Sequence, residues 1–357
     1  SHTHCGPELR LSKAALGELS EERFRQVASY RNRLKNTICK LVERALKNLE
    51  PVRVRYSFAR AGFAMNRRLR RGDKFVIGPN PEGPVDHIVP VLRIDRIKEG
   101  LLAVLFSYAC HNTTLNFYKF CGDYAGYAQQ YLEQAHPTST ALFMSGCAGD
   151  QNPYPRRKLR YAKQHGRALA NAVEAALLAP GTEVKGPLYM AFEEIKLPFA
   201  RPPRREELLE QLKSENPYVR KRASVLLEEL KCKGKFPDSY PFTMQAIQFG
   251  DSLTLVAFSG EVVVEYSLAL KEKLGEKGLW IVAYCNDVFG YVPTARQLEE
   301  GGYEPIESVL YYSSLPAPFA PSLEKLILNK TCKLVRNIRS RAKKESIESC
   351  KCVGGEL

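Results

Sequence analysis

The sequence contains 357 residues, of which 44% are hydrophobic, and it carries a formal net charge of +14. This length and apolar content can bury one large core or two modest cores, and they argue against a disordered chain. The positive charge would suit a polyanion, but the basic residues are concentrated in short runs beside loops or on polar helical faces. Because they lack the interleaved aromatic residues of single-strand binders, nucleic acid is not expected as a partner.

Ten cysteines at irregular spacing are typical of reduced, partly buried thiols rather than of a disulfide scaffold. No apolar run approaches the roughly 20 residues that a bilayer crossing needs. The sequence opens on Ser1-His2-Thr3-His4 without an initiator methionine, and we expect a further segment upstream. Because any targeting peptide would lie in that segment, the sequence assigns no compartment.

The first half of the chain predicts one long helix followed by short strands. Residues 20–48 place apolar side chains at helical spacing, with Ser20 as a polar start signal and Pro51 just beyond the end. Residues 88–95 and 101–110 predict a hairpin. Turns between the short strands of residues 52–95 are predicted at 72–73, 78–81 and 83–84.

Strands and helices alternate in the second half. Strands are predicted at residues 141–145, 253–258 and 279–285, and helices at 158–178, 262–274 and 323–341. A charged helical segment at 206–233 predicts an insertion, at about residues 203–235, that lies over the core. The alternation favours an α/β fold with a mixed sheet core, flanking helices and an active site at the strand ends. We expect residues 1–357 to form a single domain.

Three histidines are candidates for a site at these strand ends. In an extended segment, side chains two residues apart share a face, so we expect His2 and His4 to point the same way, one toward a metal and the other toward a substrate. The alternative is a pair of surface histidines at a frayed terminus. His111 follows an apolar run that predicts a buried strand, and it either emerges at the sheet edge or is a satisfied core histidine.

A carboxylate and a phenol complete the set. Glu261 follows Gly260 at the predicted start of a helix, where the macrodipole alone would favour a carboxylate. Tyr291 lies in a loop, and the alternative for it is a packed ring with a paired hydroxyl. Together, two imidazoles, a carboxylate and a phenol oxygen are suited to zinc, with a position left for water, although manganese and iron suit the same atoms.

The sequence also resembles the metal-binding catalytic domain of the neutral, non-lysosomal ceramidases over nearly its whole length. The resemblance rests on His-Thr-His-Cys-Gly-Pro at 2–7, Met-Asn-Arg at 65–67, Gly-Pro-Asn at 78–80, Val-Pro-Val-Leu-Arg at 89–93, Cys-His at 110–111, Asp-Tyr with Gly-Tyr-Ala at 123–128, Cys-Ala-Gly-Asp at 147–150, Gly-Glu at 260–261, Gly-Tyr-Val at 290–292 and Glu-Gly-Gly-Tyr-Glu at 300–304. It implies a zinc-dependent amidohydrolase with one ion per chain.

Carried over residue by residue, the resemblance implies that the zinc ligands are His2, His111, Glu261 and Tyr291. It further implies that His4, Arg67 and Tyr303 line the reacting centre, where they would stabilise the oxyanion of an amide under attack. The alternatives are a solvated basic run from Arg67 to Arg71, and packing for Tyr303.

One position departs from the family. Ceramidases carry a serine in the loop after Gly-Asp, and the matching residue here is Asn152. Asparagine cannot deliver the chemistry of a hydroxyl, but its amide can donate to an oxyanion or position a substrate, so Asn152 is a further catalytic candidate. Asp150 is expected to order this loop or to bond to a ligand histidine, and the alternative is a plain turn residue.

The leading hypothesis is therefore a zinc-dependent hydrolase that cleaves the N-acyl (amide) bond of a lipid-like small molecule, with water that the metal activates as the attacking group. The alternative is a binding module for a lipid or glycan that has lost turnover together with the family's serine. A third hypothesis is a basic surface protein in peripheral contact with an anionic membrane. The sequence determines neither the acyl chain nor the oligomeric state.

Overall fold

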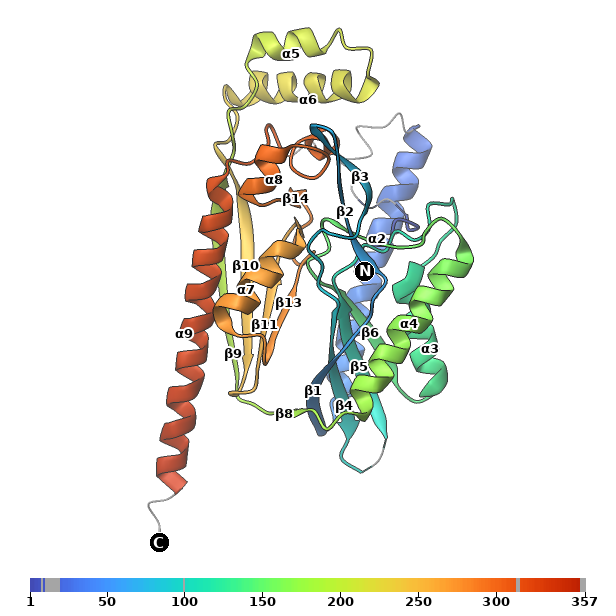
Figure 1. Cartoon of the computed structure of the whole chain (residues 1–357), viewed down its shortest axis with the longest axis vertical. Helices are drawn as coiled ribbons and strands as arrows, with labels where there is room; N and C mark the ends of the chain where they lie inside the picture. The colour runs from blue at the N-terminus through green and yellow to red at the C-terminus, as the bar shows by residue number, and fades with distance from the viewer. Residues whose placement is uncertain (8, 10–19, 99, 313–314, 354–357) are drawn as a thin grey trace.

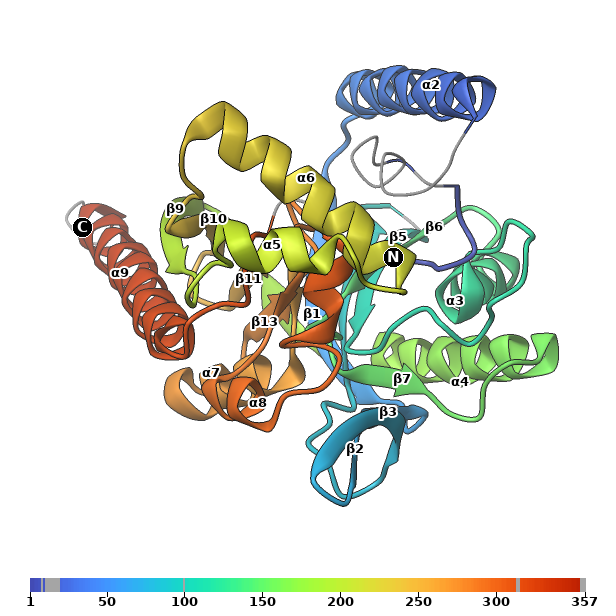
Figure 2. The same cartoon turned by 90° about the horizontal axis from the view of Figure 1, so that it is seen from above.

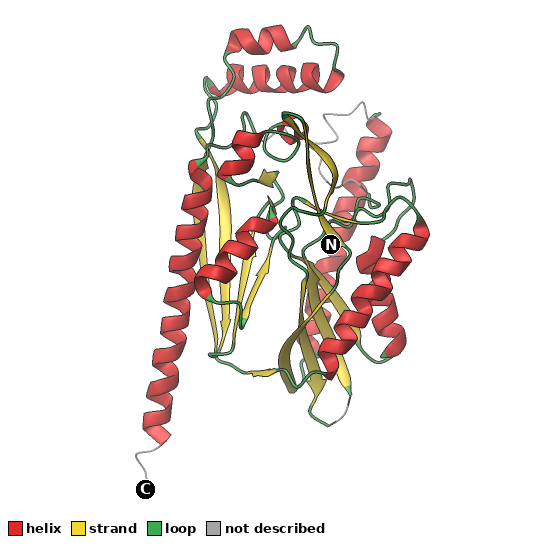
Figure 3. Ribbon diagram, in the orientation of Figure 1, coloured by secondary structure: helices red, strands yellow, loops and turns green. Residues whose placement is uncertain are grey.

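Two β-sheets pack face to face between two layers of helices, so the fold is α/β as predicted (Figures 1 and 3). The computed structural model describes residues 1–7, 9, 20–98, 100–312 and 315–353. The apolar side chains between the sheets include Trp280, whose indole nitrogen donates to the Ser107 hydroxyl of the opposite sheet at 2.7 Å. The mixed sheet core expected from the sequence thus consists of two sheets.

The first sheet has the strand order β6-β5-β4-β1-β8. Its strands are β1 (Val52–Arg60), β4 (Ile88–Arg96), β5 (Leu101–Tyr108), β6 (Thr140–Ser145) and β8 (Thr182–Val184). Strands β4 and β5 form the predicted antiparallel hairpin, and β5 and β6 run parallel. Alternate residues of β4 and β5, such as Val91 and Phe106, point outward and are covered by α3 (Asp123–Ala135) and α4 (Leu159–Leu178).

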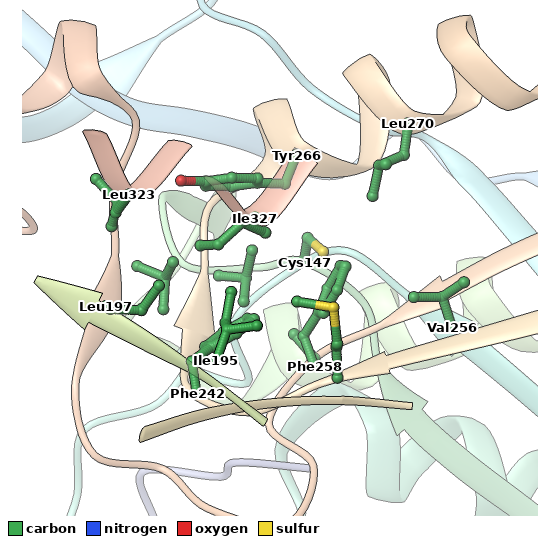
Figure 4. Close-up of a cluster of buried hydrophobic side chains, with 14 of the residues drawn as sticks. Cys147, Ile195, Leu197, Phe242, Val256, Phe258, Tyr266, Leu270, Leu323 and Ile327 are labelled. Carbon is green, nitrogen blue, oxygen red and sulfur yellow. The ribbon is translucent and has the colours of Figure 1, made fainter. Parts of the chain in front are cut away.

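The second sheet has the order β13-β11-β10-β9. Its strands are β9 (Leu188–Pro198), β10 (Ser239–Phe249), β11 (Leu253–Phe258) and β13 (Leu279–Val282). Helices α7 (Val264–Leu274) and α9 (Ser322–Val353) cover its outer face, where Tyr266 and Ile327 meet Phe242 and Phe258 (Figure 4). Strands β11 and β13 run parallel.

The two parallel pairs bring the carboxyl ends of four strands to one end of the molecule. The Ala283 amide, just after β13, donates to the carbonyl of Ser145 at the end of β6 at 3.1 Å, so the edges of the two sheets meet there. The loops after β5, β6, β11 and β13 therefore converge. Candidate residues lie on these loops, as expected for ligand sites in sheets with parallel strands.

Two small sheets complete this end; the sequence predicted the short strands on either side of the turn at 72–73, but not the pairings that form the two sheets. Strand β2 (Ala64–Arg71) pairs with β3 (Lys74–Asn80) and β7 (Gln151–Pro153), while β12 (Glu261–Val262) pairs in parallel with β14 (Tyr291–Val292). The turn predicted at 78–81 is wrong for residues 78–80, because β3 is an edge strand and its outer side tolerates Pro79, which has no amide to donate. The helix predicted to begin at 262 begins at Val264.

The remaining helices lie outside the four layers. The predicted long helix is confirmed as α2 (Glu21–Lys47), with Ser20 as its N-cap, although none of its side chains is buried. The insertion is not one helical segment but two, α5 (Arg205–Gln211) and α6 (Pro217–Lys233), which share a small apolar cluster and lie over the strand ends (Figure 2). Helix α8 (Ala295–Glu300) and a 3₁₀ turn (Glu307–Tyr311) follow β14.

Two expectations from composition can be compared with the structure. Eight of the cysteines carry free thiols, as expected for reduced thiols outside a disulfide scaffold: Cys5, Cys39, Cys110, Cys121, Cys147, Cys232, Cys285 and Cys332. Among the described residues, no helix combines the length and the apolar character that crossing a membrane requires.

We expect Gly166→Ala to lower the free energy of unfolding by about 1–3 kcal/mol, because overpacking forces tightly packed elements apart. A Cβ on Gly166 of α4 would lie 2.5 Å from the Cβ of Tyr127 and 2.9 Å from the Tyr124 carbonyl oxygen on α3. The matched control is Gly126→Ala on α3, where an added Cβ meets nothing within 4 Å and improves helix propensity by up to about 1 kcal/mol. Urea unfolding of both variants measures the difference, and equal stabilities would contradict the close approach of α3 and α4.

Candidate metal centre

The N-terminal segment lies against the loops that follow β5 and β6. Its Ser1 carbonyl accepts hydrogen bonds from the side chains of Asn112 and Ser145. His2 has a left-handed backbone conformation with φ of 55°, so the segment is not the regular extended strand assumed from the sequence. The rings of His2 and His4 nevertheless lie 5.1 Å apart, which agrees with the expectation that they share a face.

Four of the predicted site residues surround one point. His111 is buried just past the end of β5, and its Nε2 lies 3.1 Å from Oε2 of Glu261. The Nε2 of His2 lies 3.3 Å from the same oxygen. His4 joins them, because one ring nitrogen from each of the three histidines lies within 4.8 Å of the other two. The histidines are thus not a frayed surface pair and a separate core residue.

The hydrogen bond of the His111 Nδ1, on the side of the ring away from Glu261, determines what the space between Nε2 and Glu261 can bind. Its Nδ1 lies 2.5 Å from the Ala148 carbonyl oxygen, which can only accept, so Nδ1 carries the proton. Burial and then the charge of Arg67 lower the pKa of His111 to about 4, so the ring is neutral at neutral pH and Nε2 has a free lone pair. That lone pair faces a carboxylate oxygen, and a divalent cation between the two atoms satisfies both. The residues present therefore fit a metal.

Glu261 is ionised at this point. Burial alone would raise its pKa, but His2 and His111 outweigh burial and lower the pKa well below its usual range. The hydroxyl of Tyr312 donates to Oε1, on the other side of the carboxylate from the two imidazoles. An ionised carboxylate beside the neutral imidazole of His111 is the protonation state that metal binding needs.

The helix-dipole explanation for Glu261 is wrong. The residue lies in β12, and α7 begins only at Val264. The carboxylate at the start of α7 belongs to Asp150, whose Oδ1 accepts from the Val264 amide at 3.0 Å. Asp150 also accepts from the side chains of Asn66 and Gln297, so it orders the loop, and no bond to a ligand histidine is found within the described residues.

Tyr291 is placed beside Glu261 by the backbone. The two residues are register partners in the parallel β12–β14 pair. The Tyr291 ring stacks on His111 with centroids 6.3 Å apart, and its hydroxyl accepts from Arg67 at 3.0 Å. Burial, followed by the charge of Glu261, raises the pKa of Tyr291 well above its usual range even though Arg67 lowers it, so the phenolate would need a further cation such as a bound metal.

Arg67 is buried beside this cluster and does not belong to a solvated basic run. Strand β2 has a register irregularity between Asn66 and Arg68. The guanidinium groups of the neighbouring Arg67 and Arg68 both contact the carboxylate of Glu304. Its two oxygens lie 2.7 Å from Nε of Arg67 and 2.8 Å from Nη1 of Arg68. Burial alone would raise the pKa of Glu304, but the two arginines outweigh it and lower the pKa. This fixed Arg67 can aim its Nη2 at Tyr291.

Asn152 lies next to Arg67 because β7 pairs with β2, with Asn152 opposite Met65. Its Oδ1 accepts from the Thr113 hydroxyl at 3.0 Å and lies 3.5 Å from Nη1 of Arg67. Because a guanidinium only donates, the side-chain oxygen of Asn152 must be the atom that faces Arg67. Its Nδ2 amide group is then left to donate elsewhere.

Two adjoining cavities meet at this cluster. One, of about 690 Å³, is lined in part by His4, Arg67, Asn152, Tyr291 and Tyr303. The other, of about 560 Å³, is lined in part by His2, Glu261 and again by His4, Tyr291 and Tyr303. Tyr303 borders both cavities. Every predicted site residue lines at least one of them, except His111, which is buried behind.

Sequence reasoning missed three residues that hold this arrangement. Glu304 fixes Arg67, Tyr312 contacts Glu261, and Thr113 contacts Asn152. Glu304 had a signal, since it ends the Glu-Gly-Gly-Tyr-Glu motif at 300–304, but the other two had none.

Comparison with solved structures shows a ceramidase-like fold. The neutral ceramidase from Pseudomonas aeruginosa superposes on 87% of this chain with a TM-score of 0.61 and 18% sequence identity. A second structure, of a ceramidase complexed with C2, superposes on 95% with a TM-score of 0.63 and 18% identity. The chain spans 56% and 61% of the lengths of those two proteins. No protein-family model and no curated protein matches the sequence.

We expect Glu304→Gln to lower the free energy of unfolding by about 3–5 kcal/mol, because it removes the charge that compensates two buried guanidinium groups. Glu300→Gln is the matched control. Its side chain is 18% exposed and contacts Arg68 but not Arg67, so a smaller loss of about 1 kcal/mol is expected. Denaturant unfolding measures both losses. An equal effect of the two substitutions would show that Glu304 is not the main compensation for the charges of Arg67 and Arg68.

Proposed function

We propose that the chain is a metal-dependent hydrolase that cleaves the N-acyl (amide) bond of a lipid-like small molecule, with zinc as the cation. One observation carries the proposal: the unprotonated Nε2 of His111 and the Nε2 of His2 face the same oxygen of Glu261 beside two cavities. The ceramidase-like fold supports it.

The cation would be held by His2, His111 and Glu261, with Tyr291 as the fourth ligand. A bound divalent cation polarises a carbonyl and lowers the pKa of water to about 7, which is the chemistry that amide hydrolysis requires. Tyr291 is beside Glu261 in the β12–β14 ladder, so its oxygen can turn from Arg67 toward the ligand cluster.

The remaining residues would bind and polarise the amide. Arg67 is held rigidly by Glu304, and its Nη2 is aimed at the position of the Tyr291 oxygen. Asn152 presents its Nδ2 as a neutral donor, and His4 and Tyr303 border both cavities. Fixed donors around a carbonyl stabilise the negative charge that develops on its oxygen.

Purified protein should therefore contain zinc and hydrolyse at least one member of a panel of ceramides, N-acyl amino acids and N-acyl sugars. His111→Ala should lose both the metal and the turnover, because it removes a ligand and the group that orients Glu261. His136→Ala is the control, since that histidine pairs with Glu174 at the surface and away from the cluster. Elemental analysis and fatty-acid release measure the two quantities.

The panel also distinguishes the proposed enzyme from the alternative binding module. Zinc with no hydrolysis of any compound, together with tight binding of one of them, would favour the module. In that case the replacement of the family's serine by Asn152 would account for the lost turnover.

Tyr291 and His4 compete for the fourth position, and substitution separates their roles. We expect Tyr291→Phe to lose zinc to a chelator about 10-fold more readily, because the variant lacks a ligand atom. We expect His4→Gln to keep its zinc and to lose about 10²–10³-fold in kcat, as for the loss of one oxyanion donor. Chelator titration and steady-state kinetics measure the two effects. The reverse pattern would make His4 the ligand and assign Tyr291 to the substrate.

A further inference from the structure

The larger of the two cavities beside the cluster is lined by positively charged side chains. Four of the side chains that line it are cationic: Arg67, Lys119, Arg156 and Arg157. Among the described residues that line it, none is an aspartate or glutamate. A cavity that contains several cations and no carboxylate favours the entry of an anion.

Among the residues that the structure describes, a carboxylate compensates only one of these four cations. Glu304 compensates Arg67. Lys119, Arg156 and Arg157 form no ion pair within the described part of the chain, although its other loops show such pairs, for example Arg201 with Glu207. The half-buried Arg156 instead gives its Nε and Nη2 to the carbonyl of Thr113, at 3.1 and 2.7 Å.

The position of Arg156 is unfavourable for a cation without an anion. Burial and then the nearby charge of Arg157 lower the pKa of Arg156, which means that its environment disfavours the charged form. The Arg157 backbone is fixed by its amide, which donates to the Thr114 carbonyl, in a left-handed conformation with φ of 77°. The Arg156 guanidinium and the Arg157 backbone are thus held on one side of the cavity.

One residue links these cations to the proposed reacting centre. Thr113 holds Arg156 through its carbonyl, and its hydroxyl donates to Oδ1 of Asn152 at 3.0 Å. The same cavity has apolar lining from Leu115, Phe117 and Phe120. Its chemistry therefore suits an amphiphile whose anionic group lies a short distance from the bond that Asn152 faces.

We propose that this cavity is an anion-binding subsite and that the preferred N-acyl substrate carries a carboxylate or phosphate near the scissile amide. The inference rests on the proposed hydrolysis and names its substrate class. Arg156, Arg157 and Lys119 are the specificity-determining residues, and an uncharged amide such as ceramide is the poorer substrate.

Matched pairs of substrates test the proposal on the zinc-loaded protein. An N-acyl amino acid is compared with its methyl ester, and an N-acyl ethanolamine phosphate with the N-acyl ethanolamine. We expect kcat/KM to be about 10-fold or more higher for the anionic member of at least one pair, since a hydrogen-bonded charge pair contributes about that factor. The pair that shows the effect tells carboxylate from phosphate.

Substitutions locate the effect. Arg157→Gln and Arg156→Gln should each reduce the ratio of anionic to neutral kcat/KM several-fold, and the ratio should also fall with added salt. Lys221→Gln, which removes an exposed cation on α6, is the charge-matched control and should leave the ratio unchanged. If the ratio of anionic to neutral kcat/KM were the same in the wild-type protein and in all variants, the subsite would be refuted.

A binding measurement separates this proposal from the proposed reaction. Uncleavable ketone analogues of both members of each pair are titrated by calorimetry. Selective binding of the anionic analogue without turnover of any amide would refute the hydrolase and support the subsite. Turnover of both members at equal rates, with equal binding of both analogues, would support the hydrolase and refute the subsite.

Discussion

The buried carboxylate of Glu261 is the constraint on which the rest of the centre depends. An ionised carboxylate loses several kcal/mol of hydration when it is buried, and an equal amount of compensation must come from its neighbours. Those neighbours are two imidazoles and the Tyr312 phenol. The nearby permanent cation, Arg67, is already shared with Glu304. Because the His111 proton is committed to Ala148, that ring offers Glu261 a lone pair, and a cation at the point between Glu261 and the histidines would compensate the carboxylate further.

The fold provides this arrangement with few specialised parts. Parallel strand pairs in two facing sheets bring four loops to one end, and the short β12–β14 ladder then sets Glu261 against Tyr291 in register. A register irregularity in β2 turns Arg67 and Arg68 toward a single carboxylate. Backbone pairing thus fixes the positions of the polar groups, and side-chain packing fixes their orientations. Donors held in this way, such as Arg67, would need little reorganisation if negative charge developed beside them.

Local patterns were sufficient for some parts of the structure and failed for others. The α2 helix, the β4–β5 hairpin and the strand before His111 were predictable, because the apolar spacing and turn residues that specify them lie within a few positions. The β12–β14 pair and the contact of Arg67 with Glu304 were not predictable from local patterns. The contact, for example, joins residues 237 positions apart. Glu261 was placed in a helix for the same reason: the strand that it forms has only two residues, and its partner lies elsewhere in the chain.

Asn152 and the basic cavity have related consequences for the proposed chemistry. A serine hydroxyl offers a movable proton, whereas an asparagine amide offers only a fixed neutral donor, so any proton transfer in the proposed reaction falls to other groups. Arg67 and Asn152 both present donors to the same cavity wall, and Arg156 is tied to that wall through Thr113. In the proposed reaction, each of these groups would stabilise negative charge, whether it develops on the attacked carbonyl or is carried by the substrate. An asparagine in place of a serine hydroxyl would therefore change which substrates the proposed site favours, and would not by itself remove the means of stabilising a tetrahedral oxyanion.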